Sequence, residues 1–305
     1  MANRITGASD FLPKISIITP SFNQAQFLEA TIESILSQNY PNLEYIIIDG
    51  GSNDGSIDII KKYEKYLSFW CSEPDAGQYD ALNKGFCHSK GEIMSWLNSD
   101  DMYLPWALRT VADIMISLPD VEWLTTLSPG GWDYHGFCSG FGSVPGYSRE
   151  AFLDGCYLPY KNNSNFMAWI QQESTFWRRS LWDRSGGLIN SNLKLAGDFD
   201  LWSRFYLHAD LCATPSPLGG FRHQHTQRSR DINKYIEESL FSLLIARESV
   251  NWKPNFSQSK LLLTAKRVPK LKTLIKSKWG YQGKKIIRKK SDYQDGYWEV
   301  ETYRF

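Results

Sequence analysis

Acidic side chains recur at the ends of apolar segments in this chain, where carboxylates can bind cations, accept hydrogen bonds or remove protons. The sharpest cluster is Asn98-Ser99-Asp100-Asp101. Adjacent carboxylates repel each other unless a cation or a helix cap compensates them. Oxygen ligands on a loop suit a hard ion such as Mg²⁺ or Mn²⁺. The cluster therefore predicts a divalent metal at Asp100 or Asp101, and capping of the helix near Pro105 by Asp101 is a compatible alternative.

Two other acidic segments have less specific patterns. Asp49 directly follows an apolar strand, where it either stabilises a turn or accepts hydrogen bonds from a nucleotide base. Asp198 and Asp200 lie two residues apart at a predicted helix start, so they do not share one helical face. Their roles should therefore differ: one caps the helix, and the other can act as general base on an acceptor hydroxyl.

Strands and helices must bring these residues together, and the first half of the chain alternates between the two. Short apolar strands are predicted at 14–19, 43–48, 69–72 and 92–97, with amphipathic helices between them. This alternation predicts a parallel sheet with helices on both faces. Ligands of such sheets bind at the carboxyl ends of the strands, so the loops after Thr19, Ile48, Ser72 and Leu97 should form the site.

The second half of the chain changes character. Residues 128–165 are rich in Gly, Ser, Pro and aromatic residues, which predicts a long loop region with short strands, and long loops of this kind often bind ligands. Helices are predicted at 199–208 and 231–249. We expect a catalytic domain at residues 1–230 and a helical, basic appendage at residues 231–305.

Composition narrows the class of protein. The 305 residues are 42% apolar with a net charge of +1, and the five Cys include no C-x-x-C pair. This pattern predicts reduced thiols in a cytoplasmic protein. No apolar run reaches the roughly 18 residues that span a bilayer. Most of the 12 Trp are expected in the core, although aromatic faces also bind sugars.

The charge is unevenly distributed, because the segment from Lys260 to Lys290 holds 12 Lys or Arg and no acidic residue. Three interpretations remain open: a solvated tail, a peripheral contact with anionic lipid at the inner membrane face, and a nucleic-acid contact. We favour the lipid surface and expect no nucleic acid partner.

Five segments together resemble family 2 glycosyltransferases, which are inverting enzymes of the GT-A fold. They occur in the family's order and at its usual spacing across about residues 14–230. The matching segments are Ser16-Ile-Ile-Thr-Pro-Ser-Phe-Asn23, Ile47-Ile-Asp-Gly-Gly-Ser-Asn-Asp-Gly-Ser56, Gly77-Gln-Tyr-Asp-Ala-Leu-Asn-Lys-Gly85, residues 91–101 and Ala196-Gly-Asp-Phe-Asp-Leu-Trp202. The resemblance implies a Rossmann-like, mostly parallel sheet with helices on both faces, followed here by the C-terminal helical appendage.

The resemblance also implies roles for individual residues. Asp198 would be the catalytic base, and Asp100 would be the last carboxylate of the metal motif, with Asp101 as the alternative ligand. The donor nucleotide and its diphosphate would be bound by Thr19, Pro20, Asp49, Asp80, Asn83, Lys84, Asn98, Ser99 and Asp100. This sequence departs from the family at three positions: Asn98 replaces the first Asp of the metal motif, Leu82 replaces a basic residue, and Gly197 replaces an acidic one.

Weaker signals surround these motifs. Arg222 or His225 could contact the metal or diphosphate, or could belong to a solvated loop. Trp169, Gln172 and Glu173 could form an acceptor pocket, although burial in the core is the simpler account of a Trp. Gln78 could contact either substrate or only start a helix.

The expected reaction is a single displacement at the anomeric carbon, assisted by Mn²⁺ or Mg²⁺. The donor would be a nucleotide-sugar, with UDP favoured over GDP or dTDP, and the acceptor a saccharide or lipid-linked saccharide in polysaccharide biosynthesis. A non-catalytic sugar- or nucleotide-binding protein of the same fold is the alternative. A dehydrogenase is disfavoured because the loop after the first strand, Pro20-Ser-Phe-Asn-Gln-Ala25, lacks the G-x-G-x-x-G pattern.

Overall fold

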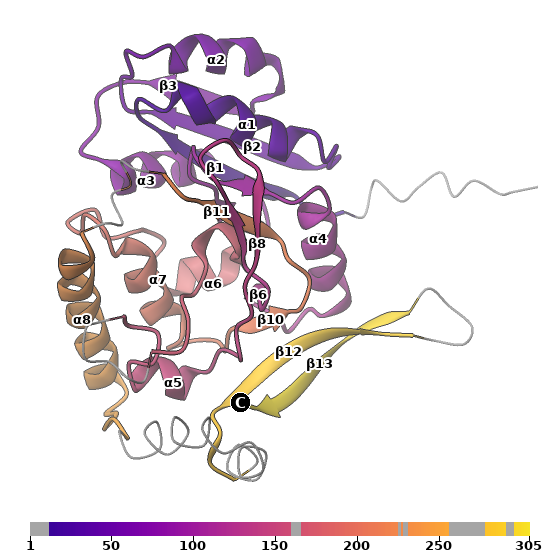
Figure 1. Ribbon diagram of the computed structural model, residues 1–305, viewed down its shortest axis with the longest axis vertical. Helices are drawn as coiled ribbons and strands as arrows, with labels where there is room; N and C mark the ends of the chain where they lie inside the picture. The colour runs from indigo at the N-terminus through magenta and orange to yellow at the C-terminus, as the bar shows by residue number, and fades with distance from the viewer. Residues whose placement is uncertain (1–11, 160–165, 225–226, 228–230, 256–277, 291–295) are drawn as a thin grey trace, which may run out of the picture.

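The computed structural model describes residues 12–159, 166–224, 227, 231–255, 278–290 and 296–305. A nine-stranded sheet runs through the centre of the molecule in the order β13-β12-β10-β6-β9-β4-β1-β2-β3 (Figure 1). Its strands are β1 (Ile15–Ser21), β2 (Leu43–Asp49), β3 (Phe69–Ser72), β4 (Ile93–Trp96), β6 (Trp123–Thr126), β9 (Phe176–Arg178), β10 (Cys212–Thr214), β12 (Gln282–Lys289) and β13 (Tyr297–Arg304). Strands β1, β2, β3 and β4 confirm the four strands predicted at 14–19, 43–48, 69–72 and 92–97.

The sheet is parallel over most of its width. Strands β3, β2, β1 and β4 pair in parallel, as do β6, β10 and β12. Between these two groups lies β9, which is antiparallel to both of its neighbours. A mostly parallel sheet buried on both faces, with crossover helices, confirms the predicted α/β fold with helices on both faces of the sheet.

Helices cover both faces because successive side chains of each strand point to opposite sides. On one face, Ile17 and Ile47 pack with α1 (Ala25–Leu36), α2 (Ser56–Tyr63) and α4 (Ala107–Ser117). On the other, Ile18 and Ile48 pack with α3 (Gln78–His88), α5 (Arg149–Leu153), α6 (Arg179–Arg184) and α7 (Gly197–Phe205). The second core contains the buried side chains of Trp96, Trp123, Trp177, Trp182 and Trp202, so these tryptophans fill the interior.

A small second sheet stands beside the carboxyl ends of the main strands. Its order is β5 (Met102–Tyr103), β11 (Gly219–Arg222), β7 (Gly130–Trp132) and β8 (Cys138–Phe141). Because β5 directly follows Asp101, pairing of β5 with β11 brings the acidic segment next to residues 219–222. The region 128–165 therefore contributes strands as well as loops.

The C-terminal part continues the same fold. Helix α8 (Ile232–Ser249) packs beside α7, and β12 pairs with β10 at the edge of the main sheet (Figure 1). The described residues after 230 thus share the core of the preceding ones, and they include a β-hairpin as well as a helix. The predicted lipid contact falls partly on residues 260–277, which lie outside the described residues. In the described part of the chain, no helix combines the length and the apolar character that crossing a bilayer requires.

One buried carboxylate connects these C-terminal segments to the rest. Asp154 accepts hydrogen bonds from Tyr281 Oη at 2.7 Å, from Trp252 Nε1 at 2.9 Å and from the Asn255 backbone N–H at 3.0 Å. The three donors come from segments on either side of residues 256–277. Asp154 therefore joins the residues on both sides of that segment to the part of the chain that contains α5.

Replacing this carboxylate should destabilise the whole molecule. Asp154→Ala leaves three donors without their shared acceptor, and we expect a loss of about 2–4 kcal/mol in the free energy of unfolding, measured by urea denaturation. Asp120→Ala, which removes an exposed carboxylate, is the matched control and should change it by less than about 0.5 kcal/mol. Equal effects of both variants would contradict the role given to Asp154.

Candidate active site

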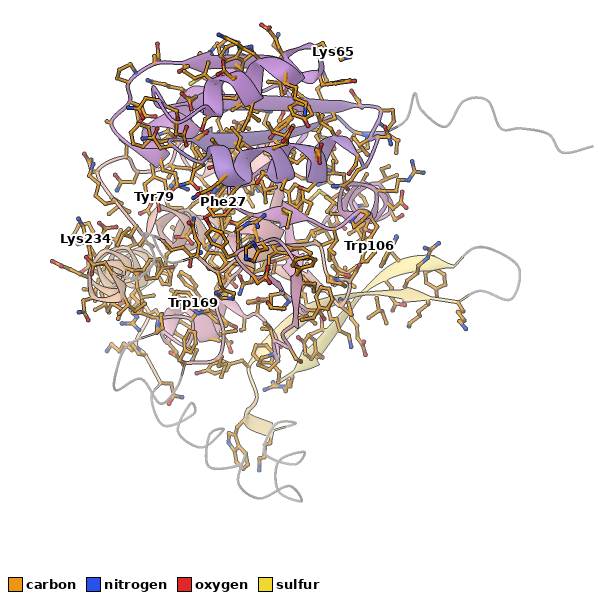
Figure 2. The ribbon with its side chains drawn as sticks, turned by 45° about the horizontal axis from the view of Figure 1, so that its top comes forward. Phe27, Lys65, Tyr79, Trp106, Trp169 and Lys234 are labelled. Atoms are coloured by element: carbon orange, nitrogen blue, oxygen red, sulfur yellow. The ribbon has the colours of Figure 1, made fainter. Side chains whose placement is uncertain are left out.

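A cleft of about 1370 Å³ opens at the carboxyl ends of the main strands. Its walls come from distant parts of the chain, including Pro20 near the end of β1, Gly50 after β2 and Asp100 after β4. Tyr79 and Trp169, labelled in Figure 2, also line it. A typical small-molecule pocket encloses about 300–1,000 Å³, so this cleft has room for more than one substrate.

The adjacent carboxylates of the acidic segment face different surroundings. Asp100 lines the cleft and accepts a hydrogen bond from Gln224 Nε2 at 2.5 Å. Asp101 is buried behind it, where its Oδ1 accepts the backbone N–H of Arg222 at 2.9 Å and its carbonyl oxygen accepts Thr31 Oγ1 at 2.8 Å. Asp100 is therefore the carboxylate placed to meet a ligand, whereas Asp101 holds the loop.

Asn98 is the centre of an amide network beneath these carboxylates. Its Nδ2 donates to Asp101 Oδ2 at 3.2 Å and to Gln172 Oε1 at 3.1 Å, and its Oδ1 accepts from Gln78 Nε2 at 2.6 Å. Gln172 in turn donates to the carbonyl oxygen of Trp96 at 2.6 Å. A carboxylate at position 98 would place negative oxygens against Asp101 and Gln172, which explains the departure from Asp.

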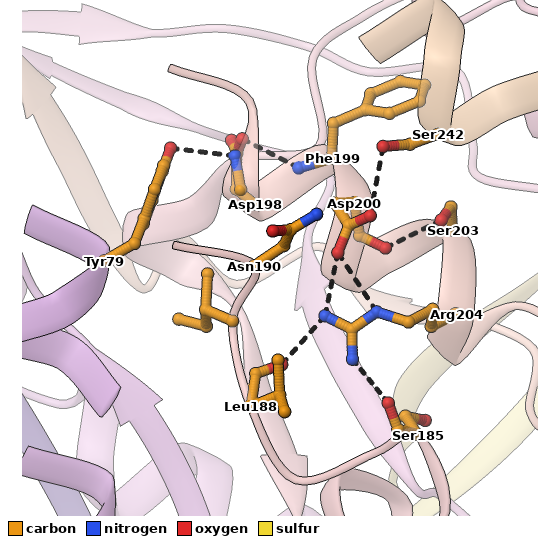
Figure 3. A network of polar contacts seen from close by, with 12 residues as sticks. Tyr79, Ser185, Leu188, Asn190, Asp198, Phe199, Asp200, Ser203, Arg204 and Ser242 are labelled. Atoms are coloured by element: carbon orange, nitrogen blue, oxygen red, sulfur yellow. Dashed lines mark hydrogen bonds and ion pairs between the residues drawn. The ribbon is translucent and has the colours of Figure 1, made fainter. Parts of the chain in front are cut away.

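Asp198 and Asp200 have different roles, as their spacing predicts (Figure 3). Asp198 lines the cleft at the start of α7, where its Oδ1 accepts the Phe199 backbone N–H at 2.7 Å. Asp200 points behind the helix, where its Oδ2 accepts Arg204 Nε and Nη2 at 3.1 and 2.9 Å. Arg204 also binds the carbonyl oxygens of Ser185 and Leu188, so Asp200 organises the loop before α7.

Tyr79 occupies the space beside Gly197. The Gly197 backbone N–H donates to Tyr79 Oη at 2.9 Å (Figure 3), and a Cβ added at position 197 would lie 2.6 Å from the Tyr79 ring. No side chain fits there without displacing the ring. With Tyr79 in this position, the contact favours glycine at position 197 over the acidic residue that the family resemblance implies there.

Four carboxyl groups in and behind the cleft have raised pKa values. Burial raises the pKa of Asp198 to about 7, and the negative charge of Glu238 adds to it. Burial also raises the pKa of Glu173 to about 7, with the charge of Asp198 as a further cause. Burial raises the pKa of Asp100 and, together with the charges of Asp100 and Glu173, the pKa of Asp101. This crowding disfavours full ionisation in the absence of a cation.

The protein also matches known families. Residues 16–134 match the family model described as glycosyl transferase family 2. The chain contains a family 2 glycosyltransferase domain. Curated relatives include an uncharacterized glycosyltransferase of Rickettsia typhi, 29% identical over 64% of this chain and 59% of that protein. Another is the putative teichuronic acid biosynthesis glycosyltransferase TuaG of Bacillus subtilis, 36% identical over 35% of this chain and 44% of that protein.

A third relative, an uncharacterized glycosyltransferase of Mycobacterium tuberculosis strain H37Rv, is 40% identical over 30% of this chain and 35% of that protein. The chain thus spans between 35% and 59% of these relatives. Among solved structures, S. aureus TarS 1-349 in complex with UDP-GlcNAc has a TM-score of 0.61 at 15% identity, over 85% of this chain and 73% of that one. This likeness supports the GT-A fold.

Several predicted donor residues of the glycosyltransferase domain line the cleft, and others do not. Pro20, Asn98, Ser99 and Asp100 belong to its walls. Thr19 is buried away from it, where its Oγ1 accepts the Tyr45 hydroxyl at 3.1 Å.

Asp49 is also buried and outside the lining, and its carboxylate is occupied by the loop after β2. It accepts the Ser52 hydroxyl at 2.5 Å, the Ser72 hydroxyl at 2.7 Å, and the backbone N–H groups of Gly51 and Ser52 at 3.1 and 2.8 Å. The carboxylate therefore shapes this loop, and its predicted contact with a base has no counterpart in the cleft lining.

The three donor residues predicted on α3 bind the protein itself. Asp80 accepts the Ala76 backbone N–H, and Lys84 pairs with Glu73 at 2.9 Å. Asn83 exchanges two hydrogen bonds, both 2.8 Å, with the backbone of Ile189. None of Asp80, Asn83 and Lys84 is among the cleft-lining residues, because these side chains leave α3 on its other sides.

Asp75 lines the cleft and was missed in the sequence. Its Oδ1 accepts the Gly77 backbone N–H at 2.8 Å, and its Oδ2 lies 2.8 Å from where a Cβ of Gly50 would be. A side chain at position 50 would therefore collide with this carboxylate. The sequence signal that could have identified Asp75 is the turn Pro74-Asp-Ala-Gly77, which follows a predicted strand.

The predicted acceptor residues Trp169, Gln172 and Glu173 all line the cleft. Gln172 and Glu173 lie in the 3₁₀ turn Gln172–Ser174, and no described residue donates a hydrogen bond to the buried Oε1 of Glu173. Trp169 packs edge-on against Tyr235 of α8, with ring centroids 5.4 Å apart. Gln78 lines the cleft as well.

Arg222 is buried and braces the acidic loop from behind. Its Nε donates to the Asp100 carbonyl oxygen at 2.6 Å and its Nη1 to the Tyr134 carbonyl oxygen at 3.0 Å, and its guanidinium lies 4.9 Å from the Phe27 ring centre. Arg222 thus stabilises the acidic loop and is not among the residues that line the cleft. His223 lines the cleft, and His225 lies outside the described residues.

The residues present fit a divalent ion held mainly by substrate. The described residues hold no group of three or more His, Cys, Asp or Glu side chains that could hold a metal. Mg²⁺ commonly uses one or two carboxylates together with substrate phosphates and water. The single carboxylate of Asp100 at the cleft wall is consistent with that mode of binding.

Replacing the side-chain nitrogen of Asn98 by an oxygen should destabilise the hydrogen-bond network around it. Asn98→Asp adds a negative charge against Asp101, so we expect the free energy of unfolding at pH 7 to fall by about 1–3 kcal/mol. The loss should shrink at pH 5, because protonation removes the repulsion. Asn192→Asp, an exposed site, is the control in the same urea titration, and a pH-independent loss at Asn98 would contradict the account.

Proposed function

We propose that the protein is an inverting glycosyltransferase that moves a sugar from a nucleotide-sugar to a hydroxyl of a saccharide or lipid-linked acceptor in polysaccharide biosynthesis. The observation that carries this proposal is the convergence of Asp100 and Asp198, 98 residues apart in the sequence, on one cleft. Asp100 would act at the diphosphate, and Asp198 would act at the acceptor hydroxyl. An inverting reaction needs these two functions on opposite sides of the anomeric carbon.

Asp198 is proposed as the general base. A carboxylate with a pKa of about 7 is a better proton acceptor than an ordinary one and is still substantially ionised at neutral pH. Its hydrogen bond from the Phe199 N–H fixes one oxygen and orients the carboxylate at the wall. Glu173, in the same cleft, would accept a hydrogen bond from a second polar group of the acceptor.

Charge balance supports a divalent cation in this reaction. Carboxylates of Asp75, Asp100, Glu173 and Asp198 line the cleft, and Lys194 is the lysine among the described lining residues. A diphosphate entering such a site would meet net repulsion. Mn²⁺ or Mg²⁺ held by Asp100 would neutralise that charge and the charge that develops on the leaving diphosphate. Asp100 would orient the ion, while Asp101 would hold the loop.

The donor is proposed to be a UDP-sugar. S. aureus TarS, which shares the fold, was crystallised with UDP-GlcNAc and with UDP. Pro20, Gly50 and Asp75, which lie at or after the ends of β1, β2 and β3, form the part of the cleft wall proposed to bind the nucleoside. TuaG, named for teichuronic acid biosynthesis, supports a role in cell-envelope polysaccharides.

Removing the proposed base should separate binding from transfer. Asp198→Asn keeps the shape of the side chain but cannot take a proton, so we expect UDP affinity in the presence of Mn²⁺ to stay within about twofold, while UDP release from UDP-GlcNAc falls by about 10²- to 10⁴-fold. Calorimetry and a coupled UDP assay measure the two quantities. Asp120→Asn at an exposed site is the control, and normal turnover by Asp198→Asn would refute the assignment.

The dependence of UDP binding on the metal ion should require the carboxylate of Asp100. UDP with Mn²⁺ is expected to raise the melting temperature by several degrees, as mass action requires of a ligand of the native state, and UDP with EDTA by much less. Asp100→Asn should abolish that difference, whereas Asp58→Asn on the exposed face of α2 should preserve it. An equal shift by UDP with and without the ion would argue against a metal-assisted mechanism.

A further inference from the structure

A carboxylate on α8 binds the loop that carries the proposed base. Glu238 accepts the backbone N–H of Lys194 at 3.0 and 3.1 Å through its two oxygens, that of Leu195 at 2.8 Å and that of Ala196 at 3.0 Å. These three N–H groups belong to consecutive residues and precede α7 directly. One charged side chain thus orders the backbone that leads into Asp198.

Hydrogen bonds of this kind are strong and directional. Each pairs a backbone donor with an ionised acceptor, which makes it about twice as strong as a neutral hydrogen bond. A negative charge near the first turn of α7 is also favoured by the helix dipole. Glu238 therefore holds residues 194–196 against α8, two residues before Asp198.

A second contact from α8 secures the far side of Asp198. Ser242, four residues after Glu238 and so on the same helical face, donates to Asp200 Oδ1 at 3.1 Å (Figure 3). Asp200 is bound in turn by Arg204. The segment containing Asp198 is thus fixed to α8 both before and after the base.

We propose that Glu238 is a positioning residue for Asp198 and that α8 is part of the catalytic machinery. This inference rests on the proposed function and goes beyond it, because α8 lies outside residues 16–134 that match the family model. Helix α8 also supplies Ile232 and Tyr235 to the cleft wall. The helix predicted as an appendage would then set the geometry of proton removal.

The electrostatic surroundings of Asp198 give this role a distinctive signature. Burial is the main cause that raises the pKa of Asp198, backbone hydrogen bonds lower it, and the negative charge of Glu238 on α8 raises it further by a smaller amount. Among the described residues, the titratable groups near Asp198 also include Glu173 from the 3₁₀ turn, Tyr235 from α8 and Tyr79 from α3, which binds the adjacent Gly197. Removing the charge of Glu238 should therefore shift the pKa of Asp198 downward, which a loss of packing alone would not do.

The test compares Glu238→Gln with Glu237→Gln in the full chain. Both remove one negative charge from α8, but Glu237 is exposed. With UDP-GlcNAc and Mn²⁺ as the probe, we expect Glu238→Gln to lower kcat for UDP release about tenfold, with KM within about twofold. The acid limb of its rate profile should move to lower pH. Glu237→Gln should match the wild type.

A second measurement does not depend on turnover. Amide hydrogen exchange at residues 194–196 should accelerate at least tenfold in Glu238→Gln and stay unchanged in Glu237→Gln. Glu238→Asp, which keeps the charge but shortens the side chain, should lower kcat without moving the acid limb.

Unchanged exchange at residues 194–196, or a loss of kcat with an unmoved acid limb in Glu238→Gln, would overturn the role of Glu238. Failure of the underlying function looks different. In that case Asp198→Asn would release UDP as fast as the wild type, whatever the behaviour of position 238.

Discussion

Burial of four carboxyl groups around one cleft is the constraint that the rest of the structure must satisfy. Burial is the main cause of the raised pKa values of Asp100, Asp101, Glu173 and Asp198, and no described arginine or lysine forms an ion pair with any of them. The protein compensates with neutral donors, chiefly the side-chain amides of Asn98 and Gln224. Burial favours the protonated form of these carboxyl groups, and a cation at the site would favour the ionised form.

The same constraint explains why residues outside the cleft lining must support the residues that form it. Neutral amides and backbone N–H groups stabilise carboxylates without cancelling their charge, so they must be held by further contacts. Arg222 performs this task behind the acidic loop, and Asn83 fixes the loop before α7. Among the described residues, hydrogen bonds rather than direct salt bridges therefore support the carboxyl groups of the cleft.

The strands and the cleft carboxylates could be predicted from the sequence because their signals are local. An apolar run such as residues 43–48 predicts a strand, and a polar residue at its end predicts the ligand edge. The partners of a polar side chain are set by tertiary contacts, so sequence reasoning could not tell that Asn83 and Lys84 bind the protein. Glu238 and the pairing of β12 with β10 depend on segments more than 40 residues apart, for which no local pattern exists.

The contact between Tyr79 and Gly197 also restricts how this site can change. The ring fills the volume that a side chain at position 197 would need, and its hydroxyl binds the backbone there. An acidic residue at 197 is therefore acceptable only after the tyrosine has become smaller, and a smaller residue at 79 leaves an unfilled hole until 197 has grown. Positions 79 and 197 are therefore sterically coupled, because either change alone disturbs packing that the paired change would restore.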